Sequence, residues 1–159
     1  MTYIKRADNE EYADIGCIFC SFPLEEKDVE NLILVRGKRV FMILNAFPYS
    51  NGHLMVTPFR HTCDANDLDD EELLEMMQLT RKAINLLKDA MHPDGFNVGM
   101  NMGRVAGAGI ADHLHMHIVP RWTGDTNFMP VLGDVRVIPE SLNAVYAKLK
   151  AILDADLAN

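Results

Sequence analysis

Short apolar runs alternate with polar breaks over much of the chain, and this pattern predicts the strands of a β-sheet. The runs lie at Asn31–Val35, Val40–Leu44, His53–Thr57, Phe96–Met100 and His113–Val119. Polar residues 36–39 separate the first two runs, which indicates a hairpin. Pro120 is expected to end the last strand, because proline cannot donate a hydrogen bond to a neighbouring strand.

Two other segments repeat their apolar residues about every 3.6 positions, which predicts amphipathic helices. The first begins near Asp67 or Asp69, either of which can cap it, and residues 92–95 should stop it. Its apolar stripe consists of Leu73, Met76, Met77, Thr80, Ala83, Ile84, Leu87 and Met91. The second covers Glu140–Leu157, with Leu142, Val145, Tyr146, Leu149, Ile152 and Leu153 facing inward. Together the elements predict an α+β fold, an antiparallel β-sheet with a long amphipathic helix and a C-terminal helix.

The composition is that of a globular protein, with 48% apolar and 24% charged residues in 159 positions. This length fits a single domain over residues 1–159. No apolar run approaches the roughly 20 residues of a membrane span, and the polar N-terminus does not resemble a signal peptide, so we expect a cytoplasmic protein. The net charge of −8 argues against a nucleic-acid polymer as partner but allows a small anionic ligand.

The last predicted strand carries histidines at alternate positions, His113, His115 and His117. Side chains alternate between the two faces of a strand, so these imidazoles share one face and the intervening apolar residues share the other. A solvated polar face is the ordinary alternative, although Thr, Lys or Glu would be more usual there. A metal site made by all three histidines is disfavoured, because same-face residues lie about 6.6 Å apart along a strand.

A glycine-rich stretch, Gly103 to Gly109, precedes this strand. Such a loop can bring backbone N–H groups close to an anion, and imidazole is a competent nucleophile toward phosphorus at neutral pH. The combination predicts a phosphate-binding site with a histidine nucleophile.

Cys17 and Cys20 form a C-x-x-C pair, whose spacing lets two thiolates bind one zinc ion. We expect His61 and His113 to complete a tetrahedral site, although Cys63 could replace His61. A thioredoxin-like redox pair is the main alternative, but it requires a βαβ context that the predicted order lacks. Two unpaired buried cysteines remain a further alternative.

The run from His113 to Val119 resembles the H-φ-H-φ-H-φ-φ signature of the histidine triad family, nucleotide hydrolases and transferases that attack an α-phosphate. Upstream, Asn45, the segment 52–58 and His61 are similar to the N-x₇-GH-x-L-V-x-P segment of the same family. Residues 107–112 and 120–128 look most like the bacterial branch that includes diadenosine tetraphosphate (Ap4A) phosphorylases.

The resemblance implies a role for each matching residue. His115 would be the nucleophile that forms a nucleotidyl-histidine intermediate on a dinucleoside polyphosphate or another nucleotide conjugate. His117 and His53 would contact the phosphates, and Asn45 the ribose. Asn101 and Gly109 would contact the α-phosphate. The residues implied around the base are Ile18, Phe19, Ile43 and Met55. For these four, plain core packing is the alternative.

The resemblance also implies structural zinc on Cys17, Cys20, His61 and His113, and a homodimer in which Trp122 and residues 127–128 reach the partner's site. One departure matters, because Gly109-Ile110 stands where many hydrolases of the family have Gln-Ser or Gln-Thr. This favours phosphorolysis or transfer over hydrolysis. Two other functions stay open: a nucleotide-binding sensor without turnover, and a hydrolase whose zinc activates water.

Overall fold

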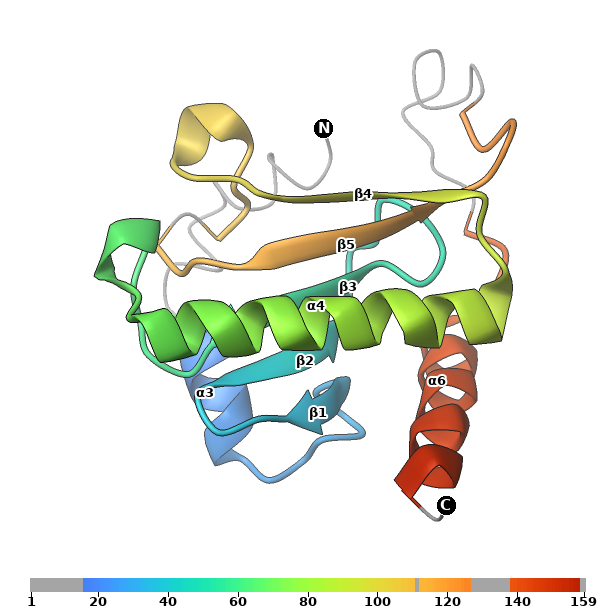
Figure 1. Cartoon of the computed structure of the whole chain (residues 1–159), viewed down its shortest axis with the longest axis horizontal. Coiled ribbons are helices and arrows are strands. Elements are labelled where there is room, and N and C mark those ends of the chain that lie inside the picture. Colours follow the sequence, from blue (N-terminus) through green and yellow to red (C-terminus); the bar gives the residue numbers. More distant parts are fainter. Residues whose placement is uncertain (1–15, 111, 127–137, 158–159) are drawn as a thin grey trace.

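The computed structural model describes residues 16–110, 112–126 and 138–157. Its centre is a five-stranded antiparallel sheet with the strand order β1-β2-β3-β5-β4 (Figure 1). The strands are β1 (Ile33–Arg36), β2 (Val40–Leu44), β3 (Leu54–Pro58), β4 (Gly95–Met100) and β5 (Met116–Arg121). The predicted α+β class and the antiparallel sheet are confirmed.

Helix α4 (Asp70–Met91) crosses one face of the sheet and contacts β2, β3 and β5 (Figure 1). Asp69 and Glu72 form a capping box at its start, and His92 ends it in the left-handed conformation with φ 48°. The predicted stripe was too wide. Met77 is 55% exposed and Leu73 is 38% exposed, because the sheet covers a narrower strip of the helix.

Helix α6 (Leu142–Leu157) packs against α4 and β1 and buries Val145, Tyr146, Leu149 and Leu153. The Tyr146 hydroxyl donates a hydrogen bond to the Ile33 carbonyl, 2.9 Å away. The helix starts two residues later than predicted, because Ser141 accepts hydrogen bonds from the backbone N–H groups of Ala144 and Val145. Across the described ranges, no helix has the length and apolar character needed to cross a bilayer.

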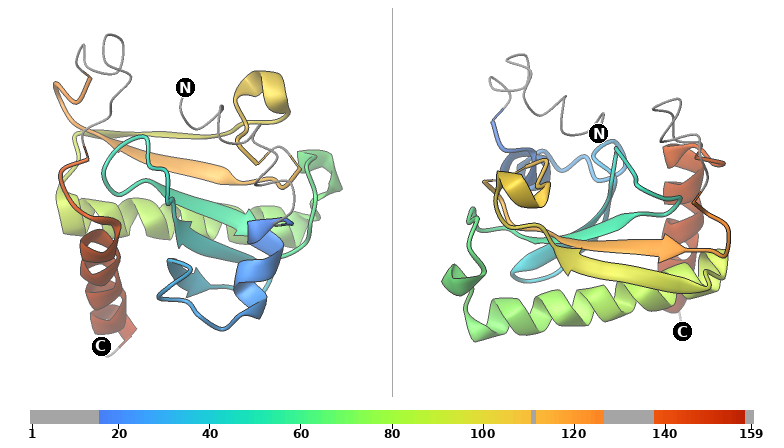
Figure 2. Two further views of the ribbon diagram at one scale, coloured as in Figure 1. Left: turned by 180° about the vertical axis from the view of Figure 1, so that it is seen from behind. Right: turned by 90° about the horizontal axis from the view of Figure 1, so that it is seen from above.

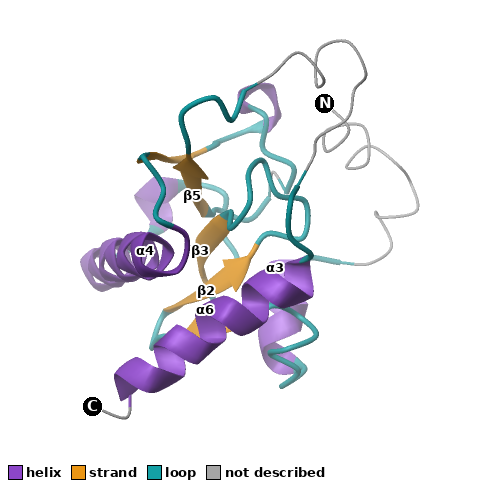
Figure 3. Cartoon of the chain, turned by 90° about the vertical axis from the view of Figure 1, so that its right-hand side faces the viewer, coloured by secondary structure: helices purple, strands orange, loops and turns teal. Residues whose placement is uncertain are grey.

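A short helix that the sequence patterns did not reveal, α3 (Ile18–Ser21), lies on the sheet face opposite α4 (Figures 2 and 3). The sheet therefore has a core on each face. The larger core lies between the sheet and α4 with α6, and the smaller one consists of Phe19, Ile33, Phe41, Ile43 and Met55. Three 3₁₀ turns complete the described elements: η1 (Phe22–Leu24), η2 (Ala65–Asp67) and η3 (Arg104–Ala106).

The last strand differs from its prediction at both ends. It begins at Met116 rather than His113, because the backbone of Leu114 bonds outside the ladder: its N–H donates to the Thr62 carbonyl and its C=O accepts from the Thr57 hydroxyl. Pro120 lies inside the strand instead of ending it. Pairing with β3 stops at Ile118, so the missing N–H of Pro120 costs no ladder bond.

Candidate active site and metal centre

His113, His115 and His117 are all buried, and the chain directs them toward the sheet face that α3 covers. His117 pairs in register with Met55, a residue of the smaller core. The intervening Leu114, Met116 and Ile118 belong to the larger core. The alternation inferred from the sequence therefore holds although only His117 lies in the strand itself, and the solvated alternative is wrong.

The hydrogen bonds of His115 determine which of its ring nitrogens carries the proton. Its Nδ1 lies 2.8 Å from the carbonyl oxygen of His113, which can only accept, so Nδ1 is protonated and Nε2 holds the lone pair. Nε2 is buried and has no hydrogen-bond partner in the described structure. Burial lowers the pKa of His115, which keeps the ring neutral. A neutral imidazole with a free Nε2 lone pair is a nucleophile ready to react.

A second hydrogen-bonded chain orients His117. The backbone N–H of Phe47 donates to Asn45 Oδ1 at 2.9 Å, so the amide Nδ2 of Asn45 faces His53 Nδ1 at 3.2 Å as a donor. The backbone N–H of Tyr49 also donates to this His53 nitrogen, at 3.1 Å. The proton of a neutral His53 therefore lies on Nε2 and is donated to His117 Nδ1, 2.9 Å away.

Because His117 Nδ1 accepts this hydrogen bond, the proton of the neutral His117 ring lies on Nε2. This Nε2 is the only polar side-chain atom of His117 without a partner in the described structure. Burial, followed by repulsion from His115 in its protonated form, lowers the pKa of His117 to about 4, so the ring is neutral at pH 7. The ring centroids of His115 and His117 are 4.7 Å apart. A lone pair on one Nε2 beside an N–H on the next suits attack on phosphorus while a phosphate oxygen is held.

The four predicted metal ligands come together beside these histidines. Cys17 Sγ lies 3.1 Å from His113 Nδ1, Cys20 Sγ lies 3.3 Å from His61 Nδ1, and all four ligand atoms lie within 4.8 Å of one another. Ligands of tetrahedral zinc lie about 3.5 Å apart, given bonds of about 2.0–2.3 Å, so the set fits zinc. His113 Nε2 donates to the Pro58 carbonyl at 2.9 Å, which leaves Nδ1 for a metal. Cys63 is exposed and is not part of this cluster.

The other predicted nucleotide contacts differ in how accessible they are. Phe19, Ile43 and Met55 are at most 4% exposed and pack in the smaller core, against which half-buried Ile18 also rests. Asn101 follows β4, whose last residue Met100 pairs with Met116 next to His115. Gly109 lies in the loop before the histidines, and the neighbouring Ile110 packs against the smaller core.

Trp122 is not brought to this site. It follows Arg121 at the far end of β5, roughly 20 Å along the strand from His115, because each strand residue advances the chain by about 3.3 Å. Its backbone N–H donates to Asp125 Oδ2 at 3.1 Å. Residues 127 and 128 lie outside the described residues.

One neighbour of the site was not found from the sequence. The ring of Tyr49 lies 4.6 Å from that of His53 and 5.5 Å from that of His117, measured between centroids. Tyr49 is in the loop between β2 and β3, where no periodicity indicates the direction of a side chain. The only signal in the sequence was that a tyrosine stands four residues before His53.

The chain is similar to several known proteins. Residues 26–124 match the HIT domain family. An "AP-4-A phosphorylase" of Mycobacterium tuberculosis is 50% identical over 115 residues, which are 72% of this chain and 59% of that protein. The chain thus spans less than two thirds of that relative's length.

Two solved structures extend the comparison. A zinc-bound histidine triad family protein from Mycobacterium smegmatis is 26% identical, with a TM-score of 0.71 over 91% of this chain and 99% of that one. A hypothetical histidine triad nucleotide-binding protein from Sulfolobus tokodaii is 29% identical, with a TM-score of 0.69 over 90% of this chain and 93% of that one.

Proposed function

The chain belongs to the HIT domain family, and from that premise we propose that it cleaves dinucleoside polyphosphates such as Ap4A through a nucleotidyl-histidine intermediate. The observation that carries the proposal is the buried Nε2 lone pair of His115, which its hydrogen bond to the His113 carbonyl makes available. The relative from M. tuberculosis supports the choice of substrate class, since its name states that activity.

In the first step, the Nε2 lone pair of His115 attacks the α-phosphorus. An N–P bond forms, the bond between this phosphorus and its bridging oxygen breaks, and ATP leaves with the electron pair. His117 donates its Nε2 proton as a hydrogen bond to a phosphate oxygen, and His53 holds His117 in that tautomer. In the second step, an oxygen of inorganic phosphate attacks the same phosphorus, the N–P bond breaks, and ADP is released.

Phosphate is the proposed second nucleophile because Gly109-Ile110 has no side-chain hydrogen-bond donor, where many hydrolases of the family have Gln-Ser or Gln-Thr. Ile110 packs against the smaller core instead. We assign Asn101 and the backbone at Gly109 to the α-phosphate, and Asn45 to the ribose. The base would rest on Ile18, with Phe19, Ile43 and Met55 forming the wall behind it.

An assay of products with purified protein and Ap4A tests this function. With phosphate present, we expect ADP and ATP in equal amounts, and without phosphate little turnover. His115→Ala should lose at least about 10³-fold in kcat, because it removes the atom that forms the covalent bond. AMP formed in the absence of phosphate would identify a hydrolase, and tight AMP binding without any product would identify a binding module.

We further propose that Cys17, Cys20, His61 and His113 hold a structural zinc ion, which would cross-link α3 to the segments after β3 and before β5. Four protein ligands leave no position for a reactive water, so this site would not perform the hydrolysis.

Removal of the metal tests the zinc proposal. A chelator should lower the free energy of unfolding by about 4 kcal/mol if free zinc had been about 1,000 times its dissociation constant. Metal analysis should find one zinc per chain in the wild type and in Cys63→Ser, whose thiol is outside the cluster, but none in Cys20→Ser. Equal denaturation curves with and without chelator would contradict the proposal.

We also propose a homodimer formed through the edge of β4. Only β5 pairs with β4 among the described strands, and Val98 on this edge is 44% exposed. An open edge offers backbone N–H and C=O groups that a second copy can pair with across a two-fold axis. The dimer would bring Trp122 of one protomer toward the other, as the family resemblance implies.

A further inference from the structure

Phe19 connects the metal cluster to the proposed nucleophile. It lies in α3 between the two cysteines and is 0% exposed. Its ring centroid is 5.3 Å from that of His113 and 5.2 Å from that of His115. The same side chain thus contacts one metal ligand and the reacting imidazole.

The buried position of Phe19 argues against a primary role in base recognition. A ring without exposed surface cannot stack on a base unless the smaller core opens. The ring instead packs at 71° against His113 and at 49° against His115, inside the wall that supports both.

The backbone gives the metal cluster a second route to the nucleophile. His113 offers Nδ1 to the cluster and its carbonyl oxygen to Nδ1–H of His115. The cluster fixes α3 at both ends of the dipeptide 18–19, through Cys17 and Cys20. A shift of α3 therefore moves the Phe19 ring against His115.

We infer that Phe19 is a positioning residue that transmits the state of the Cys17–Cys20–His61–His113 cluster to His115. When the cluster is closed, the ring holds the His115 imidazole with Nδ1 on the His113 carbonyl and Nε2 toward the substrate. When the cluster opens, the imidazole can rotate, and a smaller fraction of His115 rings is in the reactive tautomer that is protonated on Nδ1. This inference rests on the proposed function only for its effect on turnover.

Two-bond ¹H–¹⁵N NMR of the histidine side chains tests the coupling without any turnover. In zinc-loaded wild type, His115 should show one tautomer, protonated on Nδ1, and chelation should give a mixture while circular dichroism shows that the fold persists. Zinc-loaded Phe19→Leu should already give the mixed spectrum of the chelated wild type. Phe41→Leu is the matched control, since Phe41 is also 0% exposed in the same core and its ring partners are Phe19 and Phe59.

Phe41→Leu should therefore keep both the wild-type spectrum and its response to chelation. If chelation leaves the wild-type spectrum unchanged, the inference is wrong. A Phe19→Leu spectrum that is wild-type and responds fully to chelation would overturn it too, because the coupling would then run through His113 alone.

Kinetics separate positioning from base binding. Phe19→Leu should retain zinc and bind AMP within about twofold of wild type, whereas kcat should fall roughly 10- to 100-fold, as misplacement of a reacting group does. A raised Kd for AMP with unchanged kcat would instead make Phe19 a base contact. If the wild type turns over no dinucleotide, the proposed function fails while the NMR comparison still decides the coupling.

Discussion

At the scale of single residues, burial of neutral histidines makes stability depend on pH. The pKa of His117 is about 4 in the folded chain and about 6.5 when unfolded. Between these values the unfolded chain binds more protons, so the free energy of unfolding falls as the pH is lowered from about 6.5 to 4. From pH 7 to pH 5 the loss due to His117 is about 2 kcal/mol.

His117→Gln should lack this part of the pH dependence, which urea unfolding at pH 7 and pH 5 would measure for both proteins. Equal losses in variant and wild type would show that His117 is not the titrating group.

Residue identities in the site were predictable where a motif fixed them, and their tautomers were not. The alternation of His113, His115 and His117 follows from extended geometry, and the C-x-x-C spacing indicated a metal site. The proton positions depend on backbone groups of Phe47 and Tyr49, which lie in a loop whose conformation no periodicity encodes.

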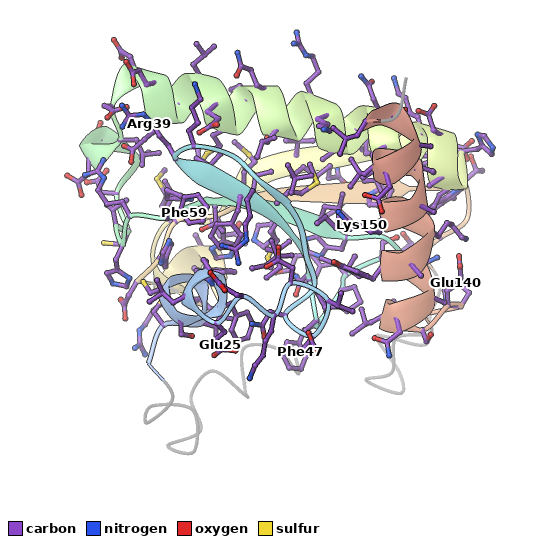
Figure 4. All side chains as sticks on the ribbon, turned by 90° about the horizontal axis from the view of Figure 1, so that it is seen from below. Glu25, Arg39, Phe47, Phe59, Glu140 and Lys150 are labelled. Atoms are coloured by element: carbon purple, nitrogen blue, oxygen red, sulfur yellow. The ribbon has the colours of Figure 1, made fainter. Side chains whose placement is uncertain are left out.

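At the scale of elements, the start of α4 is tied to one of the proposed metal ligands, His61. Glu72 closes the capping box with Asp69 and pairs with Arg60, which directly precedes His61. The neighbouring Glu71 pairs with Arg39 of the β1–β2 turn, which reaches the same end of α4 (Figure 4). The two glutamates differ in burial, since the Glu72 side chain is 5% exposed and that of Glu71 is 74% exposed.

Glu72→Ala should lower the free energy of unfolding by about 1–2 kcal/mol, because it removes a cap and leaves Arg60 without its carboxylate. Glu71→Ala should change it far less, because exposed ion pairs contribute little. Chemical denaturation of both variants gives the comparison, and equal losses would contradict the importance of burial.

The first and last residues of elements with strong periodicity were predicted to within two or three positions, whereas helix α3 was missed. Four residues are too few for a helical period to show, and the two cysteines, one directly before α3 and one within it, indicated metal binding rather than helix. The early start assigned to the last strand has a similar cause. The residues before Met116 keep a strand-like alternation of side chains, but the backbone of Leu114 bonds to Thr57 and Thr62 outside the ladder.

At the scale of the whole molecule, the proposed dimer predicts a difference between the two edges of the sheet. Val98→Lys should convert the dimer to a monomer, because the substitution puts like charges on facing strands. Val29→Lys, at a 65% exposed position before β1, should leave the dimer intact. Sedimentation equilibrium measures both, and a dimer that persists in Val98→Lys would move the interface elsewhere.

The contacts that assemble the site join parts of the chain that are far apart in sequence. Cys17 meets His113 across 96 residues, and His53 meets His117 across 64. The β1–β2 hairpin and α4 are local by comparison, and local contacts form sooner during folding. We therefore expect a chain that has formed only its local elements to lack the assembled site, because His53 has not yet met His117 and Cys17 has not yet met His113.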